Sequence, residues 1–324
     1  MNIYEKITDY RVIQNNRLVR DGFVFMSDAK KPHIFDIIVV RNPSNVDICS
    51  KNEISSRTLD EHIDLINEYK IERAVIIAED INFIVRCPSL KDIYLSPADT
   101  ASDNFDFSPL YKLPQIECLS CSTIYGDREQ FKSKIDYSKI KGKGLVDLRI
   151  ADEGHLNYNS IDTLEKLFIS LDKKHKDLSD VSSSRKLKQL NLIQCSVRSL
   201  SGIEKFENLQ TLDLSYNYSL NDINDLEKVS NSLKDLSIDR CPKIKDFSCL
   251  EKLVNLEHLC LWGGNTLPNL AFLNALKKLK IFTFSMVIED GDLTPCMQLH
   301  YAYCAKNKKF YNLKDKDLPK GQLY

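Results

Sequence analysis

The second half of this sequence repeats one pattern of apolar residues at a nearly constant interval. Each copy has the form apolar-x-x-apolar-x-apolar, and successive copies begin 22, 24, 23 and 23 residues apart. A repeat of this length is typical of a solenoid, in which equivalent units stack and bury a continuous core between them. A solenoid has no pocket prescribed by its fold, so function is sought in the side chains on its exposed sheet. The copies begin at Leu187, Leu209, Leu233, Leu256 and Leu279.

The apolar spacing within a copy predicts a strand followed by a compact return arm. The last two apolar positions are separated by one residue, so both side chains point to one side of a strand and their neighbours to the other. Consecutive copies therefore predict a parallel sheet. After the strand the apolar period becomes three, as in Leu220, Ile223, Leu226 and Val229. A period of three favours 3₁₀ turns over a regular α-helix.

The ninth position of each copy follows the strand. It holds Cys195, Asn217, Cys241 and Gly264 in four successive copies. An amide side chain at this position can hydrogen-bond to backbone groups of the adjacent turns that would otherwise lack partners. We therefore expect Asn217 to link neighbouring units.

These copies resemble the leucine-rich-repeat superfamily, and within it the short-repeat, internalin-like class found in many bacteria. The resemblance implies an α/β fold, namely a solenoid with a concave parallel β-sheet and a convex side of 3₁₀ and irregular segments. An N-terminal α+β cap is expected to precede it. In the same frame we expect further copies to begin at Ile71, Leu90, Leu113, Leu145 and Leu164, with a last strand at Leu299.

Three regions are predicted from where the repeat starts and stops. Residues 1–70 do not follow it, and they are expected to form a cap from a hairpin and an amphipathic helix. Residues 71–304 are expected to form the solenoid. Residues 305–324, which are rich in lysine, are expected to form a C-terminal cap or tail. Within the first region the hairpin is predicted over 11–25, a strand over 34–40 and the helix over 58–69.

One insertion interrupts the repeat at residues 123–144. It contains Arg128 and five lysines, which predicts a basic segment that leaves the stack and projects from it. Such a segment either contacts an acidic partner or is a solvated surface excursion.

Bulk composition excludes some classes of function. The net charge of −1 gives no overall argument for nucleic-acid binding. The N-terminus lacks a basic segment followed by an apolar one, and no run of 18 apolar residues occurs. We therefore expect a cytoplasmic protein that binds no membrane and is a monomer when free. Its ten cysteines are expected to remain reduced thiols.

The pair Cys118 and Cys121 has the C-x-x-C spacing of redox and zinc sites. In the repeat frame Cys118 falls on an inward strand position and Cys121 on the ninth position, so the spacing follows from the repeat. No second pair of Cys or His residues completes a zinc site. No metal and no cofactor are predicted.

The outward strand residues predict an acidic and aromatic face. Six of them are acidic and two are basic, although the whole chain is almost neutral. Tyrosine and tryptophan on this face offer large, rigid contact areas of the kind that dominate interfaces. The candidate partner-binding residues are Tyr94, Glu117, Asp147, Arg149, Phe168, Asp213, Asp235, Asp239, His258, Trp262, Tyr301 and Tyr303.

Such a face favours a basic protein surface and repels the phosphate backbone of nucleic acid. The predicted function is therefore a non-enzymatic protein-interaction module whose partner is a protein with a basic surface. A cytoplasmic inhibitor, such as an immunity protein that neutralises a toxin, fits this charge. The alternative is a secreted or injected effector or adhesin that binds a host protein.

A less favoured alternative is an enzyme that depends on Cys260 and His258. These residues lie two apart on one strand, with Asp235 on the next strand, so a nucleophile, a base and an orienting acid share one face. Side chains two apart on a strand are roughly 7 Å from one another, however, which is too far for the hydrogen bond that activates a thiol. No catalytic residue is predicted.

Overall fold

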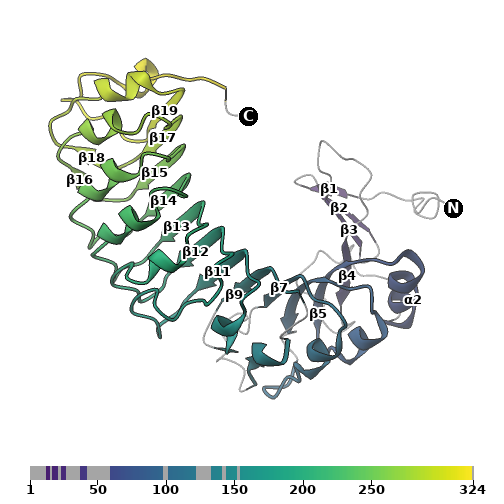
Figure 1. Cartoon of the computed structure of the whole chain (residues 1–324). Helices are drawn as coiled ribbons and strands as arrows, with labels where there is room; N and C mark the ends of the chain where they lie inside the picture. Colours follow the sequence, from purple (N-terminus) through teal and green to yellow (C-terminus); the bar gives the residue numbers. More distant parts are fainter. Residues whose placement is uncertain are drawn as a thin grey trace. The chain divides into compact units, whose positions relative to one another are not determined.

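The computed structural model describes residues 12–14, 17–20, 23–26, 37–41, 59–97, 101–121, 133–140, 144–151 and 154–322. The chain divides into two units, Met1–Asn157 and Tyr158–Tyr324 (Figure 1). In the described part of the chain, no helix is both long enough and apolar enough to cross a membrane.

The strands of the first unit follow the order β1-β2-β3-β4-β5-β6-β7-β9. Strands β1 to β4 pair antiparallel, and from β4 onward each strand pairs parallel with the next. The elements are β1 (Val12–Gln14), β2 (Arg17–Arg20), β3 (Phe23–Met26), β4 (Ile37–Arg41), α2 (Leu59–Tyr69), β5 (Arg73–Ala78), η1 (Asn82–Arg86), β6 (Asp92–Pro97), η2 (Ser108–Lys112), β7 (Cys118–Cys121), β8 (Ile135–Asp136), η3 (Tyr137–Ile140), β9 (Asp147–Ile150) and β10 (His155–Leu156).

The predicted N-terminal elements are present. β1 and β2 form the hairpin, in which Gln14 pairs with Arg17, and α2 buries Ile63 and Ile66. Strand β4 pairs parallel with β5, so the parallel array begins inside the range expected to be a cap. The domain limits themselves stay a prediction.

The predicted frame is wrong at β7. In the sheet, Leu119 lies opposite Ile93 and Leu148 and is 1% exposed, whereas Cys118 points outward. The copy therefore begins at Ile116 and not at Leu113. Both frames satisfy the apolar pattern, because a slip of three residues exchanges one set of apolar positions for another, and only pairing with β6 and β9 decides between them. Cys121 is consequently an inward strand residue rather than a ninth-position residue.

Part of the insertion packs against the first unit instead of projecting from it. β8 pairs parallel with β10, and η3 follows directly. Ile135, Tyr137 and Ile140 are at most 2% exposed. Removal of these apolar side chains from water favours the packed position of the segment. The prediction of a projecting segment is therefore wrong for residues 133–140; the rest of the insertion, apart from Gly144, lies outside the described residues.

The second unit is a parallel sheet in the order β11-β12-β13-β14-β15-β17-β19. Figure 1 shows these strands on one side and the 3₁₀ helices on the other, as the period of three predicts. The elements are η4 (Tyr158–Ser160), β11 (Lys166–Ser170), β12 (Gln189–Ile193), η5 (Ile203–Lys205), β13 (Thr211–Ser215), η6 (Asn224–Val229), β14 (Asp235–Asp239), η7 (Ser248–Lys252), β15 (His258–Trp262), β16 (Thr266–Leu267), η8 (Ala271–Asn274), β17 (Ile281–Phe284), β18 (Val287–Ile288), η9 (Thr294–Gln298), β19 (Tyr301–Cys304) and η10 (Asp315–Asp317).

Inward residues of the second unit form continuous buried columns. Leu190, Leu212, Leu236 and Leu259 lie in register on four consecutive strands, and each is at most 2% exposed. Truncation of one such side chain, as in Leu236→Ala, costs about 2–5 kcal/mol of folding free energy. One strand per repeat, a shared leucine core and a 3₁₀ return arm together decide the fold. It is a leucine-rich-repeat solenoid.

The ninth position links the units as predicted. Asn217 is fully buried; its Nδ2 donates to the Leu192 carbonyl at 2.8 Å, and its Oδ1 accepts from the Cys195 backbone N–H at 2.8 Å. In the unit of β15 this role falls to Asn265, not Gly264, since Asn265 Nδ2 donates to the Ile244 carbonyl at 2.7 Å. An extra residue at Gly263, with φ of 133°, shifts the position by one.

The last strand of the sheet is covered by the C-terminal segment. The backbone N–H of Ala302 donates to the Pro319 carbonyl at 2.9 Å, and that of Gly321 donates to the His300 carbonyl at 3.0 Å. An uncovered strand edge would present unpaired backbone groups to other chains. This pairing also holds Lys320 beside β19.

Candidate binding face

The outward residues of β11–β19 form one surface of the second unit, called here the second strand face. Nearly all are half-buried or exposed, so a partner can reach them. The predicted residues on it lie in three rows that run across the strands. They are Phe168, Asp213, Asp235, Asp239, His258, Trp262, Tyr301 and Tyr303.

Three other predicted residues meet on the first unit. Arg149 Nη1 donates to the Tyr94 hydroxyl at 3.1 Å, and Arg149 Nε lies 3.5 Å from an Asp147 carboxylate oxygen. Asp92, on the neighbouring strand β6, is paired with Arg73 at 3.1 Å. The carboxylates on this face therefore have basic neighbours in the chain, and the predicted excess of acidic charge is cancelled here.

Glu117 does not lie on a strand face. Because the copy begins at Ile116, Glu117 precedes β7, and its carboxylate lies 4.0 Å from Lys91 Nζ at the edge of the sheet. It belongs to a series of alternating charges before the strands, in which Lys188 pairs with Glu165 at 2.8 Å. Its place among the outward residues was wrong, for the same three-residue slip.

The second strand face keeps its acidic charge. Asp235 pairs with His258 Nδ1 across β14 and β15. Asp239 lies 4.0 Å from Arg240, and Asp213 accepts a hydrogen bond from the Ser215 hydroxyl. Among residues 154–322, no Lys or Arg nitrogen lies within 4.0 Å of the Asp213 or Asp235 carboxylate.

A hollow of about 220 Å³ lies in the middle of this face, between β12 and β17. Its volume is below the roughly 300–1,000 Å³ of small-molecule sites. The hollow therefore suits one inserted side chain better than a separate ligand. Its walls include Asp213, Asp235, Ser237, His258 and Cys260.

The thiol in this hollow is not prepared for catalysis. Burial raises the pKa of Cys260, and hydrogen bonds with Thr283 and Ser237 only partly oppose that rise. His258 Nδ1 is engaged by Asp235, and among residues 154–322 no hydrogen bond joins His258 to Cys260. A nucleophilic cysteine needs a lowered pKa and a nearby base. The arrangement offers neither.

Aromatic side chains gather at the β19 end of the second strand face. The Trp262 ring stacks with Tyr303, with centroids 6.3 Å apart and planes at 24°, and its Nε1 donates to Thr283 Oγ1 at 3.3 Å. Lys320 Nζ lies 5.2 Å from the Tyr301 ring centroid and 5.4 Å from that of Tyr303. The predicted aromatic residues of the last strands are thus brought together.

Sequence reasoning missed Tyr216 and Arg240, which border the same face. Both follow a strand directly, with φ of 58° and 50°. Leu171 and Gln194 have the same left-handed conformation at the equivalent position. Arg240 Nη1 donates to the Tyr216 hydroxyl at 3.0 Å, and its guanidinium lies 5.0 Å from the ring centroid. Both are the eighth residue of their copy, directly after the strand, and the repeat frame could have identified them as neighbours of the strand face.

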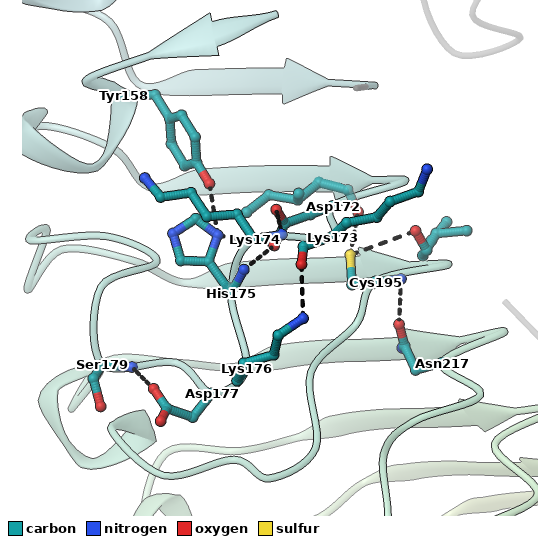
Figure 2. A network of polar contacts seen from close by, with 12 residues as sticks. Tyr158, Asp172, Lys173, Lys174, His175, Lys176, Asp177, Ser179, Cys195 and Asn217 are labelled. Atoms are coloured by element: carbon teal, nitrogen blue, oxygen red, sulfur yellow. Dashed lines mark hydrogen bonds and ion pairs between the residues drawn. The ribbon is translucent and has the colours of Figure 1, made fainter. Parts of the chain in front are cut away.

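A second Asp–His pair of this unit lies inside the fold (Figure 2). Asp172 Oδ2 accepts from His175 Nδ1 at 2.8 Å, and the Tyr158 hydroxyl lies 3.4 Å from the same nitrogen. All three residues are at most 8% exposed, so no partner contacts them directly. Burial by itself would raise the pKa of Asp172, but hydrogen bonds and the charge of His175 hold it below its ordinary value.

Comparisons with known proteins give structural likenesses. No family model matches the chain, and no curated protein matches it. Among solved structures it is similar to an internalin (inlF) from Listeria monocytogenes, with 18% identity, a TM-score of 0.49, and coverage of 76% of this chain and 71% of that one. It is also similar to internalin C2 from the same organism, with 20% identity, a TM-score of 0.39, and coverage of 61% and 73%.

A third likeness is to the functional domain of InlJ from Listeria monocytogenes, described as including a cysteine ladder. The identity is 18%, the TM-score 0.46, and the coverage 72% of this chain and 47% of that one. In the present chain the ninth-position thiols of Cys195 and Cys241 donate to backbone carbonyls of the preceding unit, at 3.5 and 3.3 Å. Burial raises their pKa values to about 12 and about 11.

Proposed function

We propose that the chain is a non-enzymatic binding module that holds a basic segment of a partner protein on the second strand face. One observation carries this proposal. Asp213 on β13 and Asp235 on the adjacent strand β14 line the hollow, and within residues 154–322 no Lys or Arg nitrogen lies within 4.0 Å of either carboxylate. Asp239, also on β14, adds a third carboxylate to the face, 4.0 Å from Arg240. Complementary charge of this kind steers a basic partner and disfavours an acidic one.

The partner in this proposal is a protein rather than a nucleic acid. A phosphate backbone would be repelled by the three carboxylates. Trp262, Tyr301 and Tyr303 add rigid apolar area, which is typical of the residues that contribute most to protein interfaces. Binding through opposite charge also predicts an affinity that falls as salt is added, because the interacting groups are partly exposed.

Inhibition of the partner is the consequence that we propose first. A protein that acts on nucleic acid needs a basic active surface, and a cytoplasmic chain with an acidic face would cover it, as an immunity protein does with a toxin. Adding the chain to a captured partner would then reduce the partner's activity stoichiometrically. Unchanged activity would exclude inhibition. The alternative is an effector or adhesin, for which the partner would be a host protein.

The binding proposal is tested by charge reversal with a matched control. The face variant is Asp235→Lys with Asp239→Lys; the control variant is Glu207→Lys with Glu289→Lys, two exposed residues that do not lie on the strand face. Affinity capture from source cells is followed by calorimetry with the captured partner. We expect the face variant to lose at least 100-fold in affinity and the control less than threefold. Equal affinity of both variants would overturn the proposal.

A further inference from the structure

The chain binds two of its own cationic side chains on aromatic rings beside carboxylates. Lys320 Nζ contacts the rings of Tyr301 and Tyr303 and pairs with Asp315 at 2.8 Å. Its Nζ also donates to the Ala302 carbonyl at 2.6 Å. A cation over an aromatic ring is attracted by the negative ring face, and a nearby carboxylate adds to that attraction.

Arg240 repeats the arrangement at the other side of Trp262. Its guanidinium lies over the Tyr216 ring, 5.0 Å from the centroid, and 4.0 Å from Asp239. Arg240 donates its backbone N–H to the Trp262 carbonyl at 3.0 Å, so it adjoins the strand that carries this tryptophan. Both sites join an aromatic ring, a carboxylate and a cation of the chain itself.

Trp262 is a third ring in the same setting. Asp239 lies opposite it on β14, in register, and its ring is half-buried on the strand face. Within residues 154–322, no basic side chain lies over the Trp262 ring. Tyr303 supports the ring by stacking, and Thr283 accepts its Nε1 hydrogen bond, so the ring is held in one orientation.

The charge around Trp262 leaves room for one cation. Asp213 and Asp239 both act on the Cys260 thiol, where they add to the effect of burial in raising its pKa. Of these two negative charges, the contact with Arg240 offsets one. Among residues 154–322, Asp213 accepts a hydrogen bond from the neutral Ser215 hydroxyl and has no Lys or Arg nitrogen within 4.0 Å, whereas Asp235 pairs with His258. The Asp213 carboxylate, which lines the hollow, therefore lacks a cationic neighbour among these residues, and a positive side chain of the partner would supply one.

We propose that Trp262, Asp213 and Asp239 form a subsite for a single cationic side chain of the partner, a guanidinium or an ammonium group. The group lies over the Trp262 ring and interacts with the two carboxylates. This subsite rests on the proposed function and specifies its anchor. Lys320 and Arg240 show how the chain itself holds such groups next to this position.

Trp262 is the one tryptophan of the chain, so its fluorescence reports on this subsite alone. The probes are the blocked peptide Gly-Gly-Arg-Gly-Gly, its lysine counterpart, and a citrulline version that keeps the shape of arginine without the charge. Titration at constant ionic strength is expected to change the emission saturably with the two charged peptides. The ratio of their affinities distinguishes guanidinium from ammonium. Absence of saturation with both, or equal affinity of the citrulline peptide, would overturn the subsite.

Two variants and a control locate the charge. Asp213→Asn and Asp239→Asn are each expected to lower the affinity for the charged peptides at least fivefold. The control Glu207→Gln, which removes one charge from an exposed residue before β13, is expected to lower it less than twofold. Thermal unfolding of each variant verifies the fold. Equal weakening by all three substitutions would show general charge attraction and contradict the subsite.

Calorimetry with the captured partner separates this inference from the proposed function. Trp262→Leu and Asp213→Asn are expected to weaken partner binding at least tenfold. Suppose that partner binding is lost in the double variant Asp235→Lys with Asp239→Lys, while Trp262→Leu and Asp213→Asn bind the partner as the wild type does. The subsite is then wrong and the proposed function stands. If charge reversal has no effect, the function itself is wrong.

Discussion

Two Asp–His pairs in the second unit place the same chemistry in different surroundings. Asp172 and His175 are buried inside the fold, with side chains 11% and 5% exposed, whereas Asp235 and His258 lie on the strand face, 39% and 46% exposed. The desolvation that makes a buried pair costly to break hardly acts on an exposed one. The difference teaches that the buried pair determines stability, while the exposed pair is available for binding.

Removal of one member of the buried pair is expected to give the largest effect on stability. In His175→Ala the carboxylate of Asp172 loses its partner inside the fold, which costs about 3–5 kcal/mol. His258→Ala at the exposed pair is expected to cost less than about 1 kcal/mol. Chemical denaturation of both variants measures the contrast. Similar losses for the two would remove the distinction between the pairs.

Replacement of the whole buried pair sharpens this contrast. The backbone N–H of Arg198 donates to the Lys176 carbonyl, and the backbone N–H of Asn221 donates to the Arg198 carbonyl, so these three residues are equivalent in successive units. The residues directly before them are equivalent too, and His175 therefore occupies the place that Val197 and Leu220 take in the next two units. Asp172→Asn with His175→Leu is therefore expected to lie within about 1–2 kcal/mol of wild type. It should also bind the partner as wild type does, whereas Asp235→Asn should bind about tenfold more weakly. Calorimetry and denaturation together test both statements.

The pH dependence of stability tests the buried pair by a third route. The folded pKa of Asp172 lies below its ordinary value of 3.8, so its contribution is complete above that value and is lost as the pH falls through the folded pKa. The free energy of unfolding should therefore decrease more steeply with acid in wild type than in Asp172→Asn. Equal slopes in the two proteins would contradict the assignment.

Thiol reactivity gives the smallest expected difference. Burial raises the pKa of both Cys260 and Cys195, the latter to about 12. Because the thiolate is the reactive form, alkylation at neutral pH should be slow at Cys260 and slower at Cys195. Mass spectrometry after timed treatment with iodoacetamide measures both rates. Rapid stoichiometric reaction of Cys260 would revive the enzyme alternative.

Much of the fold was predictable, because leucines that recur every 22 to 24 residues permit few other arrangements. The strands β12 to β17, their 3₁₀ arms and the linking role of Asn217 are confirmed. The frame at β7 was not predictable, since Leu113 and Ile116 both fit the pattern. The role of Asn265 was hidden for a related reason: one extra residue after β15 moves the position without changing the leucines.

The candidate site was predictable in position and only partly in charge. The alternation of strand residues placed Asp213, Asp235 and Trp262 on one face, as the structure has them. It did not reveal that Arg73 neutralises Asp92, because this pair joins strands β5 and β6 and a single sequence contains no record of that contact. Arg149 and Asp147 lie on one strand, β9, whereas the hydrogen bond from Arg149 to Tyr94 again joins different strands. Whether these residues bind a partner stays a prediction.

The sequence by itself determined the repeat and, except at β7, the strand in each copy and the side of the strand on which each residue lies, since these follow from local periodicity and from burial of leucine. The tertiary structure decided which charges find partners. His175 and His258 are the same residue type, and each pairs with an aspartate. His175 fills an apolar column beside Asp172, whereas His258 lies on the strand face beside Asp235. Packing between neighbouring repeats, and not local pattern, sets the burial of each pair and with it the free energy of each charge.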